Sequence, residues 1–239
     1  MRRRACYSLI MDELAKRYQA VRERITQAAL QAGRAPSDVQ LLVVSKTFGP
    51  ELVAQVAALG QRDFGENYVQ EGVDKIAALR HLPGLVWHCI GPLQSNKTRL
   101  VAEHFDWVHS VDRLKIAQRL SEQRPAHLPP LQLCLQVNID GGATKAGVAP
   151  EEALALAQAV SALPQVNLRG LMTIPDPVEG FEQQVAVHRQ AKQLFEDLRV
   201  ALTLPHFDTL SMGMSADLEA AVQAGSNMVR VGTAVFGAR

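Results

Sequence analysis

The chain has 239 residues, of which 47% are hydrophobic and 21% charged, and its formal net charge is +1. This composition supports a sizeable buried core and excludes an intrinsically disordered chain. A net charge so close to zero argues against general attraction to nucleic acid or an anionic membrane, and the longest basic run is Arg2-Arg3-Arg4. The sequence has no apolar run near the roughly 20 residues that a membrane span needs, and the segment after Arg4 lacks a signal-peptide pattern. We therefore expect a cytoplasmic protein without nucleic-acid or membrane partners.

The three cysteines, Cys6, Cys89 and Cys134, are far apart in the sequence. They form no C-x-x-C pair and no spacing typical of metal ligands, and their number is odd. We expect buried thiols in a reducing compartment, and no metal site.

The predicted elements begin with a helix over residues 8–32, where apolar residues recur at three- and four-residue spacing. Gly33 and Pro36 end it. Short apolar runs then alternate with amphipathic or alanine-rich segments. The runs predict strands over 41–45, 62–65, 86–90, 106–109, 132–138, 167–172, 207–211 and 228–231. The segments between them predict helices near 50–59, 67–79, 96–104, 112–122, 150–162, 180–202 and 215–223.

Eight strands that alternate with helices predict a single (β/α)8 TIM barrel with an extra N-terminal helix. The alternative is a doubly wound open sheet, which usually has fewer strands and a glycine-rich first turn. The G-x-G-x-x-G motif of that turn is absent. The proline-rich segment 124–130 fits a loop before the fifth strand, so we expect one domain over residues 1–239.

The first predicted strand, 41–45, leads directly into Lys46. Its continuous apolar run is typical of a strand buried on both faces of a parallel sheet. An ammonium where the strand leaves the core is partly desolvated, and desolvation favours the neutral, nucleophilic amine. Lys46 is then either a Schiff-base lysine or a lysine that simply reaches water at a strand end.

Small and polar residues follow the last two predicted strands. Ser211-Met212-Gly213-Met214-Ser215 follows the seventh strand, and Gly232-Thr233 follows the eighth. Small residues let backbone N–H groups approach a ligand, and a helix N-terminus favours an anion. Active sites of barrels lie at the C-terminal ends of the strands, with phosphate sites commonly after strands seven and eight. Segment 211–215 alone would equally suit an ordinary helix cap, but the two segments together predict a phosphate site.

Other polar residues allow more than one interpretation. Arg230 shares a strand face with Gly232, so it either forms a structural ion pair inside the barrel or faces a ligand. His88 is expected to be a hydrogen-bonded core histidine, and Trp107 and His109 to be packing residues. Four basic residues are expected on solvated helix faces: Lys75, Lys97, Arg99 and Arg113.

A lysine at one strand end and a phosphate site across the barrel mouth suit a phosphorylated aldehyde, for which pyridoxal 5′-phosphate (PLP) is the obvious candidate. Six segments also resemble the pyridoxal phosphate homeostasis protein family, which includes the YggS and PROSC proteins. They are VSKT (44–47), FGENYVQ (64–70), HCIGPLQSNK (88–97), GLM (170–172), LSMGMS (210–215) and VRVGTAVFG (229–237). The similarity covers nearly all of residues 12–238, and the motifs are specific when taken together.

This resemblance implies a monomeric barrel like the N-terminal domain of alanine racemase. It implies that Lys46 is the imine lysine, that Arg230 approaches the pyridine nitrogen and that Asn67 lies beside the ring. It places the phosphate against Ser211, Met212, Gly232 and Thr233. In two respects the sequence departs from the family: loop 140–147 leaves a role for Lys145 open, and the chain ends at Arg239, where relatives commonly add a polar tail.

Two functions follow from these residues. The first is a PLP-binding protein of vitamin B6 homeostasis, which buffers the cofactor or delivers it to apo-forms of PLP enzymes and has no catalytic residues. The alternative is a fold-type III amino-acid racemase or decarboxylase of weak activity. Racemisation needs a second acid/base, which in alanine racemase is a tyrosine from a further domain and a partner subunit. We expect no such domain here, and only Tyr68 of the three tyrosines is expected near the mouth, so the sequence favours the carrier.

Overall fold

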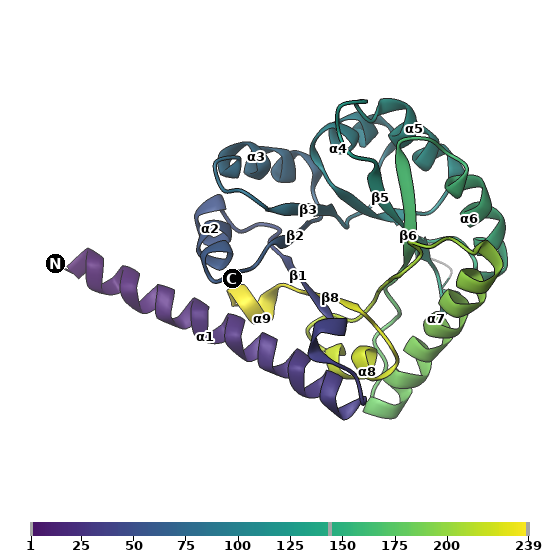
Figure 1. The fold of residues 1–239 in the computed structure, drawn as a ribbon. Coiled ribbons are helices and arrows are strands. Elements are labelled where there is room, and N and C mark those ends of the chain that lie inside the picture. Colours follow the sequence, from purple (N-terminus) through teal and green to yellow (C-terminus); the bar gives the residue numbers. More distant parts are fainter. Residues whose placement is uncertain (1, 143–144, 238–239) are drawn as a thin grey trace.

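Eight parallel strands form a closed barrel in which each strand pairs with the next along the chain and β8 pairs with β1 (Figure 1). The structure, a computed structural model, describes residues 2–142 and 145–237, with side chains from Asp12 onward. The strands are β1 (Gln40–Val44), β2 (Asp63–Glu66), β3 (Val86–Cys89), β4 (Trp107–Val111), β5 (Leu131–Val137), β6 (Val166–Thr173), β7 (Thr209–Ser211) and β8 (Met228–Val231). All eight predicted strands are confirmed, each within two residues of its predicted ends.

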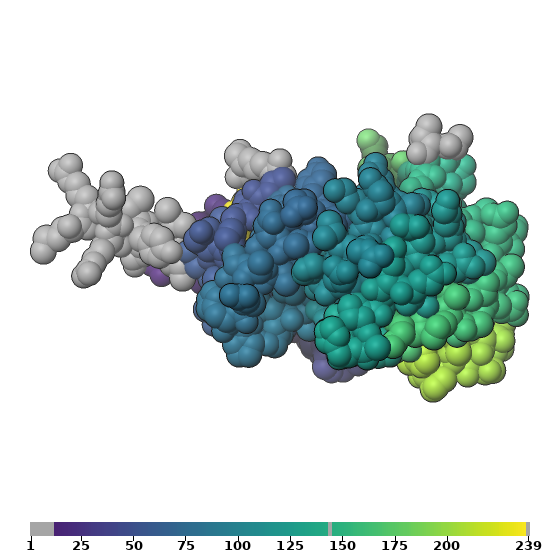
Figure 2. All heavy atoms as spheres, turned by 90° about the horizontal axis from the view of Figure 1, so that it is seen from above, coloured from purple at the N-terminus to yellow at the C-terminus, as the bar shows by residue number. Residues whose placement is uncertain are grey.

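Helices surround the barrel and follow one another in chain order, so that in the space-filling view consecutive segments lie side by side from blue through teal to green (Figure 2). The helices are α1 (Arg2–Gln31), α2 (Pro50–Ala58), α3 (Val69–Leu79), α4 (Thr98–His104), α5 (Leu114–Gln123), α6 (Ala153–Ser161), α7 (Phe181–Leu202), α8 (Leu218–Gln223) and α9 (Thr233–Phe236). Short 3₁₀ helices cover Pro36–Asp38, Ser95–Lys97 and Pro150–Glu152. The predicted barrel with an N-terminal helix is confirmed. None of the described helices is long and apolar enough to cross a membrane.

The N-terminal helix α1 packs against α8 and α9 (Figure 1). Its buried residues Tyr18, Val21, Ile25 and Ala29 recur at three- and four-residue spacing, which places them on one face of the helix. The Tyr18 hydroxyl donates a hydrogen bond to Gln61 next to β2. The helix α9 was not predicted, because its four residues are too few for a recognisable pattern.

The two faces of the barrel wall differ in chemistry. Along β8, Val229 and Val231 join the large apolar core between the strands and the helices, whereas Met228 packs with Leu42 in a small cluster of its own. Residues alternate between the two faces of a strand, so Arg230 lies on the same face as Met228. Along β8 the outer face is therefore apolar, whereas the inner face carries a small apolar cluster and the buried polar side chain of Arg230.

Close contact between β6 and β7 depends on Gly170. Its φ is +155°, and a Cβ atom at this position would lie 1.7 Å from the carbonyl oxygen of Thr209. Only glycine fits such an approach without a shift of the backbone. The contact holds β7 in register, with Ser211 beside Met172 of β6.

Cys89 and Cys134 are free and buried. Burial raises the pKa of each thiol to about 12, so both are protonated at neutral pH and behave as small apolar groups. Their expected burial is confirmed, whereas the side chain of Cys6 lies outside the described ones.

Candidate functional site

A cavity of about 280 Å³ opens where the chain leaves the C-terminal ends of β1 and β8. Its volume is near the lower end for small-molecule sites, which is about 300 Å³. It brings together four of the residues predicted from the sequence. The lining residues are Val44, Lys46, Phe48, Met214, Ser215, Ala216, Arg230, Gly232 and Thr233.

Lys46 is the second residue after β1, and its side chain is half-buried. Thr47 has a left-handed backbone, with φ of 66°, so the chain turns directly after the lysine. The Thr47 amide donates a hydrogen bond to the Glu71 carboxylate, which fixes this turn. Nothing in residues 2–142 and 145–237 forms a hydrogen bond or ion pair with the Lys46 amine. The cavity therefore contains an amine without a polar partner.

Four residues under this turn form a polar group that we call the outer cluster: the buried Ser45, Glu66 and Lys75, and the partly exposed Glu71. The Lys75 ammonium lies 2.6 Å from the Ser45 carbonyl oxygen, 2.8 Å from Glu66 Oε1 and 2.7 Å from Glu71 Oε1. The Ser45 hydroxyl also donates to Glu66 Oε1, at 2.5 Å. The outer cluster thus holds the backbone that carries Lys46.

The outer cluster corrects one prediction: Lys75 was expected on a solvated helix face, but its side chain is only 5% exposed. The Lys75 side chain extends from α3 toward β2 and fills the space between these two elements. Burial raises the pKa of Glu66, and the hydrogen bonds from Lys75 and Ser45 oppose this rise only in part. Arg99 and Arg113 are exposed, as predicted, and Lys97 is half-buried.

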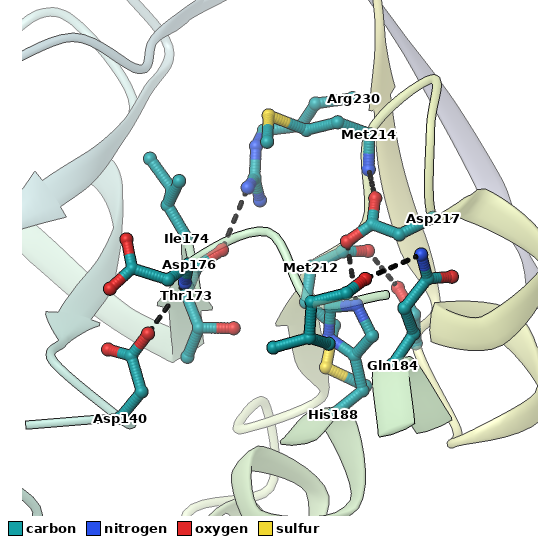
Figure 3. Close-up of polar contacts among 12 residues, drawn as sticks. Asp140, Thr173, Ile174, Asp176, Gln184, His188, Met212, Met214, Asp217 and Arg230 are labelled. Atoms are coloured by element: carbon teal, nitrogen blue, oxygen red, sulfur yellow. Dashed lines mark hydrogen bonds and ion pairs between the residues drawn. The ribbon is translucent and has the colours of Figure 1, made fainter. Parts of the chain in front are cut away.

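Arg230 of β8 is buried, and its guanidinium reaches across the inside of the barrel. One of its nitrogens donates to the Ser211 carbonyl oxygen at 2.8 Å and to the Ser211 hydroxyl at 2.7 Å. Another donates to the Thr173 carbonyl oxygen at 2.8 Å, as Figure 3 shows. Burial lowers the pKa of Arg230 to about 10, against the opposing charge of Asp217, so the guanidinium is charged at neutral pH. Arg230 is therefore a fixed cation at the floor of the cavity.

Asp217 holds the loop between β7 and α8 that carries Met214 and Ser215. Its carboxylate accepts a hydrogen bond from the Met214 amide at 2.7 Å and lies 2.9 Å from His188 Nε2 (Figure 3). Burial raises the pKa of Asp217, but the hydrogen bonds from His188 and Met214 outweigh it and the net shift is downward. On the outer side, Arg24 of α1 donates to the Ser215 carbonyl oxygen at 2.9 Å. The loop is thus fixed from both sides.

Ser211 and Met212 do not line the cavity. Ser211 is the last residue of β7, and its buried hydroxyl lies 3.0 Å from His109 Nδ1 in addition to its bond from Arg230. The Met212 amide donates to the Met228 carbonyl oxygen, and its side chain belongs to the apolar core. The phosphate contacts of these two residues remain predictions. The sequence placed Met214 and Ser215 within the predicted phosphate segment 211–215, but the resemblance assigned the contacts of that segment to Ser211 and Met212; Ala216 was not predicted.

Three buried polar atoms that have no hydrogen-bond partner in the described part of the chain lie at the same end of the barrel. Asn67 Oδ1 follows β2, Asn138 Oδ1 follows β5, and Thr173 Oγ1 lies at the end of β6. Such atoms are uncommon, since burial without a hydrogen bond is unfavourable. A polar ligand at the mouth could complete their hydrogen bonding. Asn67 is not among the residues that line the cavity, so its place beside a cofactor ring remains a prediction.

Lys145, whose role the sequence left open, is bound to acidic residues. Its ammonium lies 2.8 Å from Asp140 and 3.0 Å from Asp176, and it donates to the Ile174 carbonyl oxygen. Burial lowers the pKa of Lys145, but the hydrogen bonds to the two carboxylates outweigh it and the net shift is upward. Lys145 therefore ties the loop after β5 to the loop after β6.

His88 is a hydrogen-bonded core histidine, as predicted. Its side chain is buried, with Nε2 3.1 Å from Asp63 and Nδ1 2.9 Å from His109. His109 is more than the packing residue that was predicted, because both of its ring nitrogens have polar partners. Trp107 stacks on the His88 ring, with ring centroids 5.3 Å apart.

Comparison with known proteins places this geometry in a family. The family model described as the alanine racemase N-terminal domain matches residues 17–239. The pyridoxal phosphate homeostasis protein of Pseudomonas aeruginosa is 57% identical over 229 residues, which cover 96% of this chain and 97% of that protein. The protein of the same name from Escherichia coli K12 is 53% identical over 231 residues, with 96% and 98% covered.

Solved structures agree. PipY of Synechococcus elongatus, determined with PLP bound, is 38% identical with a TM-score of 0.82, and the match covers 94% of this chain and 100% of that one. An alanine racemase of Clostridium difficile shares the fold at 16% identity and a TM-score of 0.73, over 94% of this chain and 57% of that one. By its high identity to the curated relatives over almost its whole length, the chain belongs to the pyridoxal phosphate homeostasis protein family.

Proposed function

We propose that the protein binds PLP and serves vitamin B6 homeostasis by buffering or delivering the cofactor, without catalysing a reaction. The observation that carries the proposal is the cavity in which Lys46 shares the lining with Ser215, Gly232 and Thr233. The names of the relatives and the PLP bound to PipY support it.

The described residues fit a phosphorylated aldehyde. Lys46 offers an amine that has no polar partner among the residues that the structure describes. The amides of Ser215 and Ala216 have no acceptor within the described part of the chain, and the Ser215 and Thr233 side chains carry hydroxyl groups. Backbone amides and hydroxyls are the donors that phosphate groups commonly take in proteins. When bound, PLP supplies an aldehyde that condenses reversibly with a primary amine and releases water.

Each residue has a distinct task in this proposal. Lys46 provides the amine, and its turn keeps it at the cavity. Ser215, Gly232 and Thr233 bind the phosphate. Arg230 donates a hydrogen bond to a polar atom of the ring. A guanidinium has no acceptor atom, so Arg230 cannot accept a hydrogen bond from the ring.

The chemistry of the lining favours a carrier over the alternative of a racemase or decarboxylase. Of the described residues that line the cavity, only Lys46 and Arg230 have titratable side chains. Racemisation needs an acid/base on each face of the substrate carbon. Tyr68 is 60% exposed and does not line the cavity, and Tyr18 is bonded to Gln61. The lining thus offers one acid/base amine and one fixed cation.

Three further parts of the proposal concern the cellular setting. We propose that the protein works as a cytoplasmic monomer and that its partners are apo-forms of PLP enzymes. A delivery experiment tests the partners: holo-protein should activate an apo-enzyme faster than the same concentration of free PLP does. Equal rates would leave buffering as the function.

The decisive test of the site uses Lys46→Ala. Protein mixed with PLP should show the absorption band of the imine, and borohydride should fix the cofactor to Lys46, as detected by peptide mass spectrometry. The band should be lost in Lys46→Ala and kept in the control Lys115→Ala, whose lysine is exposed on α5. An unchanged spectrum of Lys46→Ala would refute the assignment. Turnover of any amino acid at about 1 s⁻¹, the low end for enzymes, would favour the racemase or decarboxylase instead.

A further inference from the structure

A continuous hydrogen-bond chain crosses the inside of the barrel beneath the cavity. We call it the inner chain: Asp63, His88, His109, Ser211 and Arg230. Its successive contacts measure 3.1 Å from Asp63 to His88, 2.9 Å from His88 to His109, 3.0 Å from His109 to Ser211 and 2.7 Å from Ser211 to Arg230. The two imidazoles and the Ser211 side chain are fully buried. The chain therefore joins a cation at the cavity to a carboxylate at the opposite end of the barrel.

With His88 neutral, the two ends set one direction for every hydrogen bond. Arg230 can only donate, so the Ser211 oxygen accepts from it, and an ionised Asp63 can only accept, so His88 Nε2 carries a hydrogen. His88 Nδ1 then accepts from His109 Nε2, and His109 Nδ1 accepts from the Ser211 hydroxyl. Both imidazoles are neutral in this arrangement. Burial, with the nearby charge of Arg230, holds the pKa of His109 well below its usual value, which agrees with a neutral ring.

The opposite direction is unfavourable for two reasons. It would protonate His88 on both nitrogens and so add a second cation to a barrel that already contains Arg230. It would also make His109 the donor to Ser211, so that the serine hydroxyl would have to donate elsewhere. The described residues offer no other acceptor within reach, since His109 and Arg230 are the side chains bonded to this hydroxyl. A buried donor without an acceptor costs about 1–3 kcal/mol.

We propose that Asp63, His88 and His109 are positioning residues that turn the Ser211 hydroxyl away from the cavity and hold the Arg230 guanidinium toward the cofactor ring. Ser211 then contributes to the site through Arg230, and Ser215 is the serine that contacts phosphate. This inference rests on the proposed function for the identity of the ligand. The orientation of the chain itself does not depend on it.

The first test needs neither a variant nor a ligand. Histidine side chains labelled with ¹⁵N report by NMR which ring nitrogen carries the hydrogen. Both His88 and His109 should be neutral with the hydrogen on Nε2, and Ser211→Ala should shift the His109 Nδ1 resonance. A doubly protonated His88, or a hydrogen on His109 Nδ1, would overturn the proposal.

The second test compares PLP with pyridoxal, which lacks the phosphate. Loss of a residue that contacts the phosphate weakens the binding of PLP only, whereas loss of a residue that positions Arg230 weakens the binding of both compounds. Ser215→Ala should lower the affinity for PLP about tenfold and the affinity for pyridoxal less than about twofold. Ser211→Ala should lower the affinity for both compounds by a similar factor of about five, and it should shift the imine absorption band. A Ser211→Ala effect on PLP alone, or on neither compound, would count against the proposal.

The two tests separate this inference from the proposed function. If the wild-type protein binds neither PLP nor pyridoxal, the proposed function fails, and the histidine tautomers still decide for or against the orientation of the inner chain. If PLP binds but the tautomers are reversed, the proposed function stands and the inference fails.

Discussion

The strand β2 contributes a carboxylate to two buried polar groups on opposite faces of the barrel wall. Glu66 points outward into the outer cluster, and Asp63 lies at the end of the inner chain. In the outer cluster the opposite charges touch, with 2.8 Å between Lys75 and Glu66. In the inner chain two neutral imidazoles and a hydroxyl separate the charges of Asp63 and Arg230. The two groups support the two titratable side chains of the proposed site, Lys46 and Arg230.

The outer cluster and the inner chain should differ in how much stability is lost when one of their charges is removed. The outer cluster depends on Lys75, the cation that neutralises Glu66, and Glu66 Oε2 already lacks a hydrogen-bond partner among the described residues. The Lys75 and Glu66 side chains are only 5% and 0% exposed, so water cannot replace a missing charge in this pair, although Glu71 at its edge is 28% exposed. The inner chain has an accessible end, since the Asp63 side chain is 18% exposed and lines a cavity of about 550 Å³ at the N-terminal end of the barrel. We therefore expect the outer cluster to govern stability and the inner chain to govern orientation.

The largest effect on stability is expected from a variant that breaks the outer cluster. Lys75→Met keeps the apolar stem but leaves Glu66 buried without its cation, which should destabilise the protein by about 3–5 kcal/mol in urea unfolding. The folded-state pKa of Glu66 is already raised above its ordinary value of 4.5. The folded protein thus holds this proton more tightly than the unfolded chain, and lowering the pH toward 4.5 favours folding. The deficit of Lys75→Met should shrink over that range.

The control for this variant is the double change of Glu66→Gln with Lys75→Met. It removes both charges, so it should recover most of the lost stability at pH 7. A loss below about 1 kcal/mol in Lys75→Met, the size of an ordinary hydrogen bond, would contradict the importance assigned to the outer cluster.

The contrast also shows what the sequence could and could not predict. Apolar runs located all eight strands, and strand ends located Lys46, Gly232 and Thr233 at the mouth. Lys75 was misplaced because a lysine on an amphipathic helix normally reaches water, and its burial follows from the separate position of Glu66. Ser211 was assigned to the phosphate in place of Ser215, since the sequence does not show that the Ser211 hydroxyl contacts Arg230 and His109 inside the barrel.

The inner chain was beyond sequence reasoning for a related reason. Asp63, His88 and His109 come from three different strands, and nothing in their spacing shows that they touch. Their contacts depend on the register between neighbouring strands, which brings Asp63 beside Val86 and His88 beside Trp107. The sequence thus predicts elements and their ends, while contacts across the barrel need its closed geometry.

A smaller effect should follow from a change at the end of the inner chain. Asp63→Asn keeps an oxygen that accepts from His88 and removes only the charge, so the direction of the chain persists. The loss of stability should be about 1 kcal/mol, because a neutral hydrogen bond replaces a charge-assisted one. Urea unfolding at pH 7 measures it. A loss as large as that of Lys75→Met would show that the inner chain is the more charge-dependent group.

The smallest effect is expected where opposite charges meet at the surface. Arg24 and Glu219 form a paired contact at 2.7 and 2.9 Å, but their side chains are 35% and 40% exposed. Water screens such a pair, so its contribution to the free energy of unfolding should be only about 0.5 kcal/mol, and less at high salt. Arg24→Met measures it by urea unfolding, together with the loss of the hydrogen bond to the Ser215 carbonyl oxygen. The hydrogen bond from Arg24 lowers the pKa of Glu219, although burial raises it. The contribution is therefore present above 4.5 and lost as pH falls through the lower folded-state pKa. The control is Arg22→Met on the same helix, because Arg22 has no ion pair with a described residue. A loss of stability in Arg24→Met as large as that in Lys75→Met would show that burial does not explain the difference between the two ion pairs.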